Sequence, residues 1–225
     1  MNYKLNLKIF IINSAIYNFL NFFREIIVWH RQNYRGRSPT FIKRSLLIKN
    51  SLPNSIWIET GTYLGQTSKF LSKNSLQVYT IEPEKNLFKS VKKYLNKYKN
   101  IITINNTSEL ALEKLLSKKI KKNVNFFLDA HNVSNNNTKT YKGSVSNPIL
   151  NELQIIKKKI NNLKNFIIFI DDVNWHKIDY VGTHKNTTSK LDQIINWCRK
   201  NNLCWEIDHN VMICKKNTNR VGEKF

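Results

Sequence analysis

The residues best suited to chemistry lie around two glycines that follow the first clear apolar run. That run ends at Glu59, Gly61 and Gly65 come next, and a segment with helical spacing follows them. Glycine permits backbone conformations and close approaches that a Cβ atom would block. A second apolar run, residues 77–81, ends at Glu82, whose carboxylate can accept hydrogen bonds from both hydroxyls of a ribose. This spacing predicts a pocket for a nucleotide-like ligand between a strand, a tight turn and the start of a helix.

Further acids follow two later apolar runs. Asp129 and His131 come after residues 124–128, and Asp171 and Asp172 come after residues 166–170. Ligands of doubly wound sheets bind beyond the carboxyl ends of the strands, so we expect these side chains in one place. Three carboxylates that lie close together repel one another unless a hard cation with oxygen ligands compensates. The sequence therefore predicts a divalent-cation site at Asp129, Asp171 and Asp172, with capping of the following helices as the alternative role of these acids.

The elements that must position these residues alternate regularly from Trp57 onward, which is typical of a parallel sheet covered on both faces. We expect strands at 56–59, 77–81, 101–104, 124–128 and 166–170, and helices at 65–73, 84–97, 108–118, 147–163 and 188–201. Two more apolar runs, 204–207 and 211–214, are so close that they predict a hairpin. The predicted fold class is α/β and Rossmann-like, with a mainly parallel sheet, helices on both faces and a C-terminal antiparallel hairpin.

The N-terminal segment is rich in apolar and aromatic residues, but polar residues interrupt it. Asparagines, Arg24 and Glu25 break the run 5–29, which argues against a transmembrane helix of about 20 apolar residues. Apolar residues recur from Ile12 to Ile27 in steps of three and four, which predicts an amphipathic helix. Its apolar face could pack on the domain, form a homodimer or bind a membrane surface, and packing within the protein is our preferred interpretation. We expect this helix and a basic link at 1–38, the main domain at 39–216 and a tail at 217–225.

The composition is strongly basic, with a formal net charge of +22 over 225 residues. The lysines are spread along the chain and interleaved with asparagine, so a solvated lysine-rich surface is the preferred explanation. An anionic partner such as a nucleotide-sugar, a lipid head group or RNA is the alternative. Three cysteines without metal-ligand spacing and the absence of a signal-peptide layout point to the cytoplasm, with membrane association as a further option.

The glycine turn resembles motif I of class I S-adenosylmethionine (SAM)-dependent methyltransferases, with Tyr63 where many members carry a middle glycine. The span from Pro39 to Asp172 is also similar to a group of bacterial methyltransferase-like proteins in the phrases Glu59–Thr62, Leu128–His131, Pro148–Leu153 and Ile170–Asp172. The resemblance implies a SAM-dependent methyltransferase with Glu82 on the ribose and Asp129 at the reacting end. It implies that Glu59, Thr60, Gly61 and Gly65 shape the methionine end of the pocket. The loop after the third strand offers Thr107 and Ser108 as cofactor-binding residues in place of a frequent acid.

The strand-end acids resemble those of cation-dependent O-methyltransferases of the catechol and macrocin types. This resemblance implies Mg²⁺ at Asp129, Asp171 and Asp172, where it would bind the acceptor hydroxyls. Catechol-type enzymes carry a lysine base where this chain has Asn132. His131 is the nearest substitute as a catalytic base beside Asp129, and His176 is a further candidate.

The predicted function is methyl transfer to oxygen on a small-molecule or glycan acceptor. One alternative is a catalytically inactive SAM-binding protein that acts through a partner or a membrane. The other is an RNA methyltransferase, motivated by the charge, although no amine-methylation motif and no RNA-binding module is recognisable in the sequence.

Overall fold

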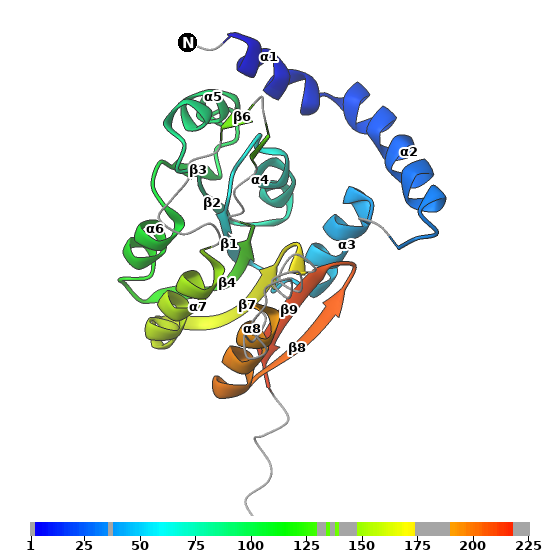
Figure 1. Cartoon of the computed structure of the whole chain (residues 1–225). Coiled ribbons are helices and arrows are strands. Elements are labelled where there is room, and N and C mark those ends of the chain that lie inside the picture. The colour runs from blue at the N-terminus through cyan, green and yellow to red at the C-terminus, as the bar shows by residue number, and fades with distance from the viewer. Residues whose placement is uncertain are drawn as a thin grey trace, which may run out of the picture.

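A seven-stranded sheet with the order β3-β2-β1-β4-β7-β9-β8 organises the chain (Figure 1). The computed structural model describes residues 3–35, 38–129, 134–135, 138–139, 148–173 and 190–217. The strands of this sheet are β1 (Ser55–Thr60), β2 (Gln77–Ile81), β3 (Ile101–Ile104), β4 (Ile120–Leu128), β7 (Leu163–Ile170), β8 (Leu203–Asp208) and β9 (Val211–Lys216). The first five pair in parallel, and β9 pairs antiparallel with both β7 and β8. The fold class predicted from the sequence is therefore confirmed.

Helices cover both faces of the sheet. They are α3 (Thr40–Asn50), α4 (Gln66–Leu71), α5 (Lys85–Leu95), α6 (Ser108–Leu115), α7 (Ile149–Lys158) and α8 (Lys190–Lys200), with short 3₁₀ turns η1 (Ser72–Asn74) and η2 (Ile160–Asn162). Successive side chains of a strand point to opposite faces. Trp57 and Phe169 therefore pack against α3 and α4, whereas Ile58 and Phe126 pack against α6, α7 and α8. Burial on both faces explains why these strands read as continuous apolar runs. A separate two-stranded pair is formed by β5 (Ser134–Asn135) and β6 (Thr138–Lys139).

The hairpin at the end of the described chain turns on two residues. His209 and Asn210 both have positive φ angles, of 46° and 68°, as the favoured two-residue hairpin turns require. The turn lies beside the carboxyl end of β7, because the Val173 N–H donates to the Asn210 carbonyl at 3.2 Å. The predicted hairpin is confirmed, and it borders the edge of the sheet where the acids gather.

The N-terminal segment forms two helices, α1 (Tyr3–Ile12) and α2 (Ala15–Arg31), instead of the single helix predicted. The break has a local cause in the sequence. The Asn13 side chain donates to the carbonyls of Ile9 and Leu64, both at 2.9 Å, and the Ser14 hydroxyl caps α2 by accepting from the Tyr17 N–H at 3.2 Å.

The two N-terminal helices extend as an arc beyond the sheet (Figure 1). Ile9 of α1 is buried with Val91 and Leu95 of α5, so α1 packs within the protein, whereas α2, which carries most of the predicted apolar stripe, buries none of its residues fully. Packing of that stripe within the protein, the interpretation preferred from the sequence, does not hold for its exposed residues Ile16, Phe19 and Leu20. Among the described helices, none has both the length and the hydropathy needed to cross a membrane.

Candidate functional site

The turn between β1 and α4 requires both of its glycines. Gly61 and Gly65 have φ angles of 95° and 76°, in the region where a Cβ atom is strained. At Gly65 a Cβ atom would also lie 2.9 Å from a methyl carbon of Val91 in α5. The N–H groups of Gly61 and Thr62 donate to the Ile81 carbonyl at 3.1 and 3.0 Å. The turn is thus fixed against the end of β2, as the predicted pocket requires.

Glu59 and Thr60 support this turn from beneath, and both are completely buried. One carboxylate oxygen of Glu59 accepts hydrogen bonds from the hydroxyls of Ser68 and Thr80. Its other oxygen has no hydrogen-bond partner within the described part of the chain. Thr60 joins β1 to β4, because its carbonyl and hydroxyl accept from the Asp129 N–H at 3.1 and 3.3 Å.

Glu82 lies at the end of β2 and faces the glycine turn. Its two oxygens accept from the N–H groups of Tyr63 and Glu84 at 3.0 and 3.1 Å. The residue is almost fully buried, and this burial raises the pKa of its carboxyl to about 7. Each carboxylate oxygen can accept more than one hydrogen bond, so both oxygens retain capacity for a ligand donor.

The buried acids predict a measurable dependence of stability on pH. Burial raises the pKa of Glu59 from its ordinary 4.5 to about 8, because the charged form loses its hydration. A carboxyl whose pKa is higher in the folded protein binds its proton more tightly there. Its contribution to stability is complete below pH 4.5 and is lost as pH rises toward 8. We therefore expect the melting temperature of the ligand-free protein to fall by several degrees over this interval.

The matched comparison uses Glu59→Gln and the exposed Glu113→Gln. Glutamine cannot ionise, so Glu59→Gln should flatten the dependence of melting temperature on pH even if it lowers stability at every pH. Glu113→Gln should keep the slope of the unchanged protein. Equal slopes for Glu59→Gln and the unchanged protein in scanning calorimetry would contradict the expectation.

Thr107 and Ser108 lie at the start of α6. The Thr107 hydroxyl caps the helix by accepting from the Leu110 N–H at 3.5 Å, and Ser108 is buried. Asn105, which the sequence analysis missed, donates through its side chain to the Glu82 carbonyl at 2.8 Å and so supports the end of β2. A lone asparagine in an asparagine-rich chain gives no signal for this role.

Asp129, Asp171 and Asp172 come together as predicted from the strand ends. One oxygen of each carboxylate lies within 4.8 Å of the others. Burial, followed by repulsion from Asp129, raises the pKa of Asp171 to about 6, and the Lys43 ammonium opposes this rise. The cluster therefore has the charge density of a cation site, and a cationic side chain already contacts it.

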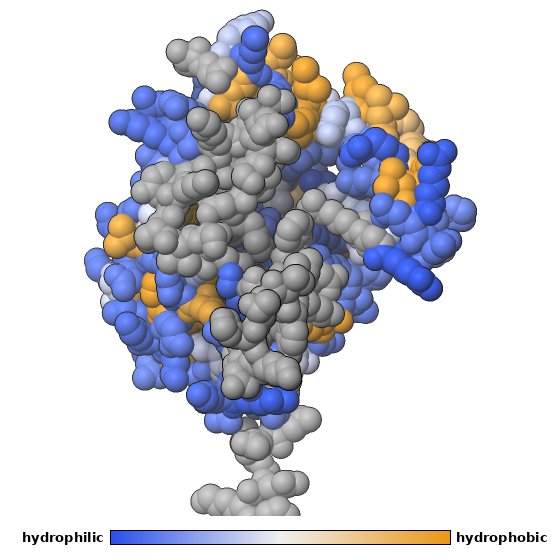
Figure 2. Space-filling model, in the orientation of Figure 1, coloured by the Kyte–Doolittle hydropathy of each residue, from blue (hydrophilic) through white to orange (hydrophobic). Residues whose placement is uncertain are grey.

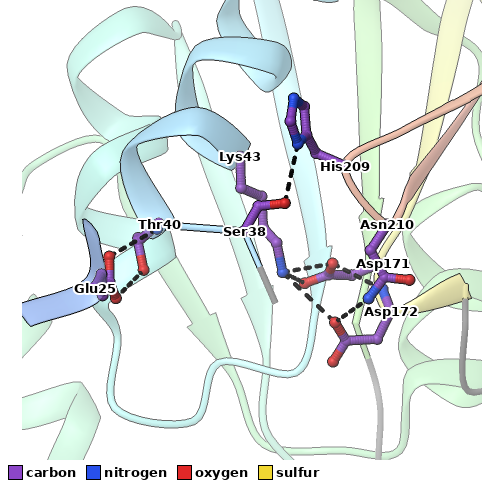
Figure 3. A network of polar contacts seen from close by, with 8 residues as sticks. All are labelled: Glu25, Ser38, Thr40, Lys43, Asp171, Asp172, His209 and Asn210. Carbon is purple, nitrogen blue, oxygen red and sulfur yellow. Dashed lines mark hydrogen bonds and ion pairs between the residues drawn. The ribbon is translucent and has the colours of Figure 1, made fainter. Parts of the chain in front are cut away.

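Lys43 supplies that charge from α3 (Figure 3). Its Nζ lies 2.6 and 2.7 Å from the two oxygens of Asp171 and 3.7 Å from the nearer oxygen of Asp172. Asp172 also accepts from the Asn210 side chain at 3.1 Å, which ties the acids to the hairpin. No local pattern distinguishes Lys43 from the many other lysines of this chain.

A pocket of about 500 Å³ lies between the acids, the glycine turn and the helices α2 and α3. Its wall includes Gly61, Asp129 and Asp171 of the predicted site, together with Lys43 and several residues of α2. Glu25 fixes α2 in place, because its oxygens accept from the N–H and hydroxyl of Thr40 at 2.8 and 2.7 Å (Figure 3). The remaining predicted site residues that the structure describes do not line this pocket: Glu59, Thr60, Gly65, Glu82, Thr107, Ser108 and Asp172.

The structure thus brings together Glu59 near the end of β1 and the acids that follow β2, β4 and β7 at one edge of the sheet, where doubly wound folds bind ligands. The candidate bases His131 and His176, and Asn132, lie outside the described residues. The contribution of α2 and α3 to the pocket was not predicted. The apolar periodicity predicted an amphipathic N-terminal helix. It did not indicate which residues on the other side of that helix would line a pocket.

No protein-family model and no curated protein sequence matches the chain. Solved structures do resemble it. A candidate methyltransferase from Streptococcus mutans in complex with SAH is 18% identical, with a TM-score of 0.51 over 80% of this chain and 99% of that one. A candidate caffeoyl-CoA O-methyltransferase from Staphylococcus aureus is 16% identical, with a TM-score of 0.52 over 79% and 82%. A SAH-bound methyltransferase from Podospora anserina is 14% identical, with a TM-score of 0.55 over 85% and 87%. The chain therefore has the class I SAM-dependent methyltransferase fold.

Proposed function

We propose that this protein is a SAM-dependent methyltransferase that methylates an oxygen atom of a small-molecule or glycan acceptor. The observation that carries the proposal is the position of Glu82. A buried carboxylate lies against a glycine turn, and each of its oxygens has only one hydrogen bond within the described part of the chain. Two adjacent hydroxyls of a ribose would satisfy both oxygens, which fits the nucleoside half of SAM.

The rest of the donor site also fits SAM. The unpartnered oxygen of Glu59 lies beneath the turn, and a buried oxygen of this kind is costly unless a donor reaches it or it carries a proton. The sulfonium of SAM is cationic, and two acids, Glu82 and Asp129, lie at this edge of the sheet on an otherwise basic chain. The pocket beside Gly61 would then hold the methionine end and the acceptor.

When bound, SAM would supply a methyl group on a positively charged sulfur. The acceptor oxygen would attack the methyl carbon, so that a carbon–oxygen bond forms, the carbon–sulfur bond breaks and SAH leaves. The protein must hold the two reactants in line, which alone can supply much of the rate. It must also accept the proton of the acceptor hydroxyl. Asp129 lines the pocket at the end of β4 and would lie at the reacting end, and we assign the role of base to His131, two positions later in the sequence.

We further propose that Mg²⁺ assists at Asp129, Asp171 and Asp172. Three carboxylates offer the hard oxygen ligands that this ion prefers, and a bound cation would lower the pKa of an acceptor hydroxyl. Lys43 contacts the same oxygens of Asp171, so the ammonium and the metal would compete. A cytoplasmic location is proposed as well, supported by free thiols at Cys198, Cys204 and Cys214.

Isothermal calorimetry with SAM, its demethylated product SAH and NAD tests the proposal directly. We expect SAM and SAH to bind at one site per chain and NAD to bind far more weakly, because the turn between β1 and α4 fits a single nucleoside. Binding of NAD without SAM would overturn the proposed function. Transfer of label from methyl-labelled SAM to a panel of hydroxylated small molecules, glycans and RNA then separates the O-methyltransferase from an inactive SAM-binding protein and from an RNA methyltransferase.

A further inference from the structure

The outward side of α2 carries a stripe of exposed apolar side chains. We call it the α2 stripe and define it as Ile16, Phe19, Leu20, Phe23 and Ile27. Ile16 exposes 74% of its surface, Phe19 65% and Leu20 62%. Their spacing of three and four residues places them on one side of the helix. Apolar colour is prominent on the arc of the N-terminal helices in the space-filling view (Figure 2). A contiguous exposed patch of this kind marks an interaction surface.

The charges around the stripe are almost entirely positive. Residues 3–35 include five lysines and arginines and a single acid, Glu25. That acid points toward α3 and is held there by Thr40, so it lies on the side of α2 away from the stripe. Arg24, Arg31 and Arg35 are exposed beside or beyond the stripe. The arrangement combines apolar side chains for burial with positive charges for an anionic surface.

A second copy of this chain fits the stripe poorly. Each chain has a formal charge of +22, and bringing two positively charged arms together would be opposed by repulsion at low and moderate ionic strength. An anionic lipid surface attracts the same charges and accepts apolar side chains at the boundary of head groups and acyl chains. We propose that the α2 stripe docks the protein on an anionic membrane, with α2 lying in the plane of the interface.

The junction with the domain is suited to hold such a helix. At the break between α1 and α2, the side chains of Gln66 and Lys69 donate to the carbonyls of Ile12 and Asn13 at 3.1 and 2.8 Å. The Asn13 side chain donates to the Leu64 carbonyl at 2.9 Å. Since α2 also lines the pocket with its inner side, docking would place the pocket near the lipid surface.

Flotation of the full chain with lipid vesicles tests the inference. One set contains phosphatidylcholine alone and the other contains phosphatidylcholine with phosphatidylglycerol, both at an ionic strength near 0.15 M, where charges interact only over distances of about 8 Å. We expect the protein to float with the anionic vesicles. The double variant Phe19→Asn/Phe23→Asn keeps every charge and should bind them roughly tenfold less tightly, because two exposed aromatic side chains no longer enter the lipid.

The control variant is Leu76→Asn/Leu110→Asn, which removes two exposed apolar side chains away from the arm and should bind like the unchanged protein. Equal vesicle binding by the unchanged protein and the Phe19/Phe23 variant would overturn the inference, because charge alone would then explain the binding. No flotation of the unchanged protein would overturn it as well. Sedimentation velocity adds a third outcome, since a dimer that the Phe19/Phe23 variant abolishes would show that a second copy covers the stripe. Membrane docking does not depend on the proposed function. SAM binding measured on the same preparations tests the function independently of vesicle binding.

Discussion

Replacing Glu82 with alanine is expected to weaken SAM binding by about 1–3 kcal/mol, which is typical of hydrogen bonds to a charged group. The physical reason is the unused capacity of the carboxylate. Its two oxygens each accept one backbone N–H, from Tyr63 and Glu84, so ribose hydroxyls would complete their coordination. Alanine removes both acceptors. Titration calorimetry with SAM and with SAH measures the loss, and the affinity for both ligands should fall to the same extent because they share the ribose.

The same substitution also removes two hydrogen bonds that hold the turn, so it needs a matched control. Glu84 caps α5 by accepting from the N–H groups of Asn86 and Leu87. Glu84→Ala therefore removes two backbone contacts of similar kind, two residues away, without removing a proposed ligand contact. It should lower the melting temperature, through the loss of a helix cap, and leave SAM affinity nearly unchanged, because no proposed ligand contact is removed. An equal loss of affinity in both variants would assign the effect of Glu82 to the turn instead of the ribose.

The sheet and its acids were predictable because local patterns and topology act together. Strands such as β1 are buried on both faces, so they appear as short apolar runs between helical segments. Once those runs are parallel strands, their carboxyl ends must lie along one edge. This is why Asp129, Asp171 and Asp172 could be placed together from the sequence, within the 4.8 Å that the structure shows.

The residues that close the pocket could not be predicted for a different reason. Lys43 lies on α3 and reaches Asp171 across 128 positions of sequence, and the chain has 37 lysines and arginines with nothing local to single it out. Asn13 breaks the N-terminal helix through a contact with Leu64, which depends on where α1 docks. Tertiary contacts of polar side chains produce no periodic pattern in the sequence, so they can be identified only in the folded structure.

Exchange of Asp171 for asparagine is expected to abolish divalent-cation binding at the acid cluster and to lower methyl transfer by about a hundredfold or more. SAM affinity should change little, because the proposed ribose contact lies at Glu82, after a different strand. Mn²⁺ serves as the probe for the metal in titration calorimetry, independently of turnover. Methyl transfer to the acceptor panel should also be lost when EDTA is added and return with Mg²⁺.

Lys43 makes this prediction sharper, because it offers a second cation for the same carboxylates. Its Nζ lies 2.6 Å from Asp171, so a metal at that oxygen must displace it. Lys43→Met removes the competing charge and keeps an unbranched side chain, and it should raise Mn²⁺ affinity by roughly tenfold through the loss of competition. Lys49→Met, on the exposed side of the same helix, is the control and should leave Mn²⁺ affinity unchanged.

The opposite results would show that the Lys43 ammonium, and no metal ion, neutralises the acid cluster. If methyl transfer resists EDTA and Lys43→Met lowers stability without gaining Mn²⁺ affinity, the metal proposal is wrong. Lys43 would then be the permanent counter-charge that keeps Asp129, Asp171 and Asp172 compatible in one place. Three carboxylates within 4.8 Å need a compensating charge in either case, and the paired measurements on Asp171 and Lys43 identify which charge it is.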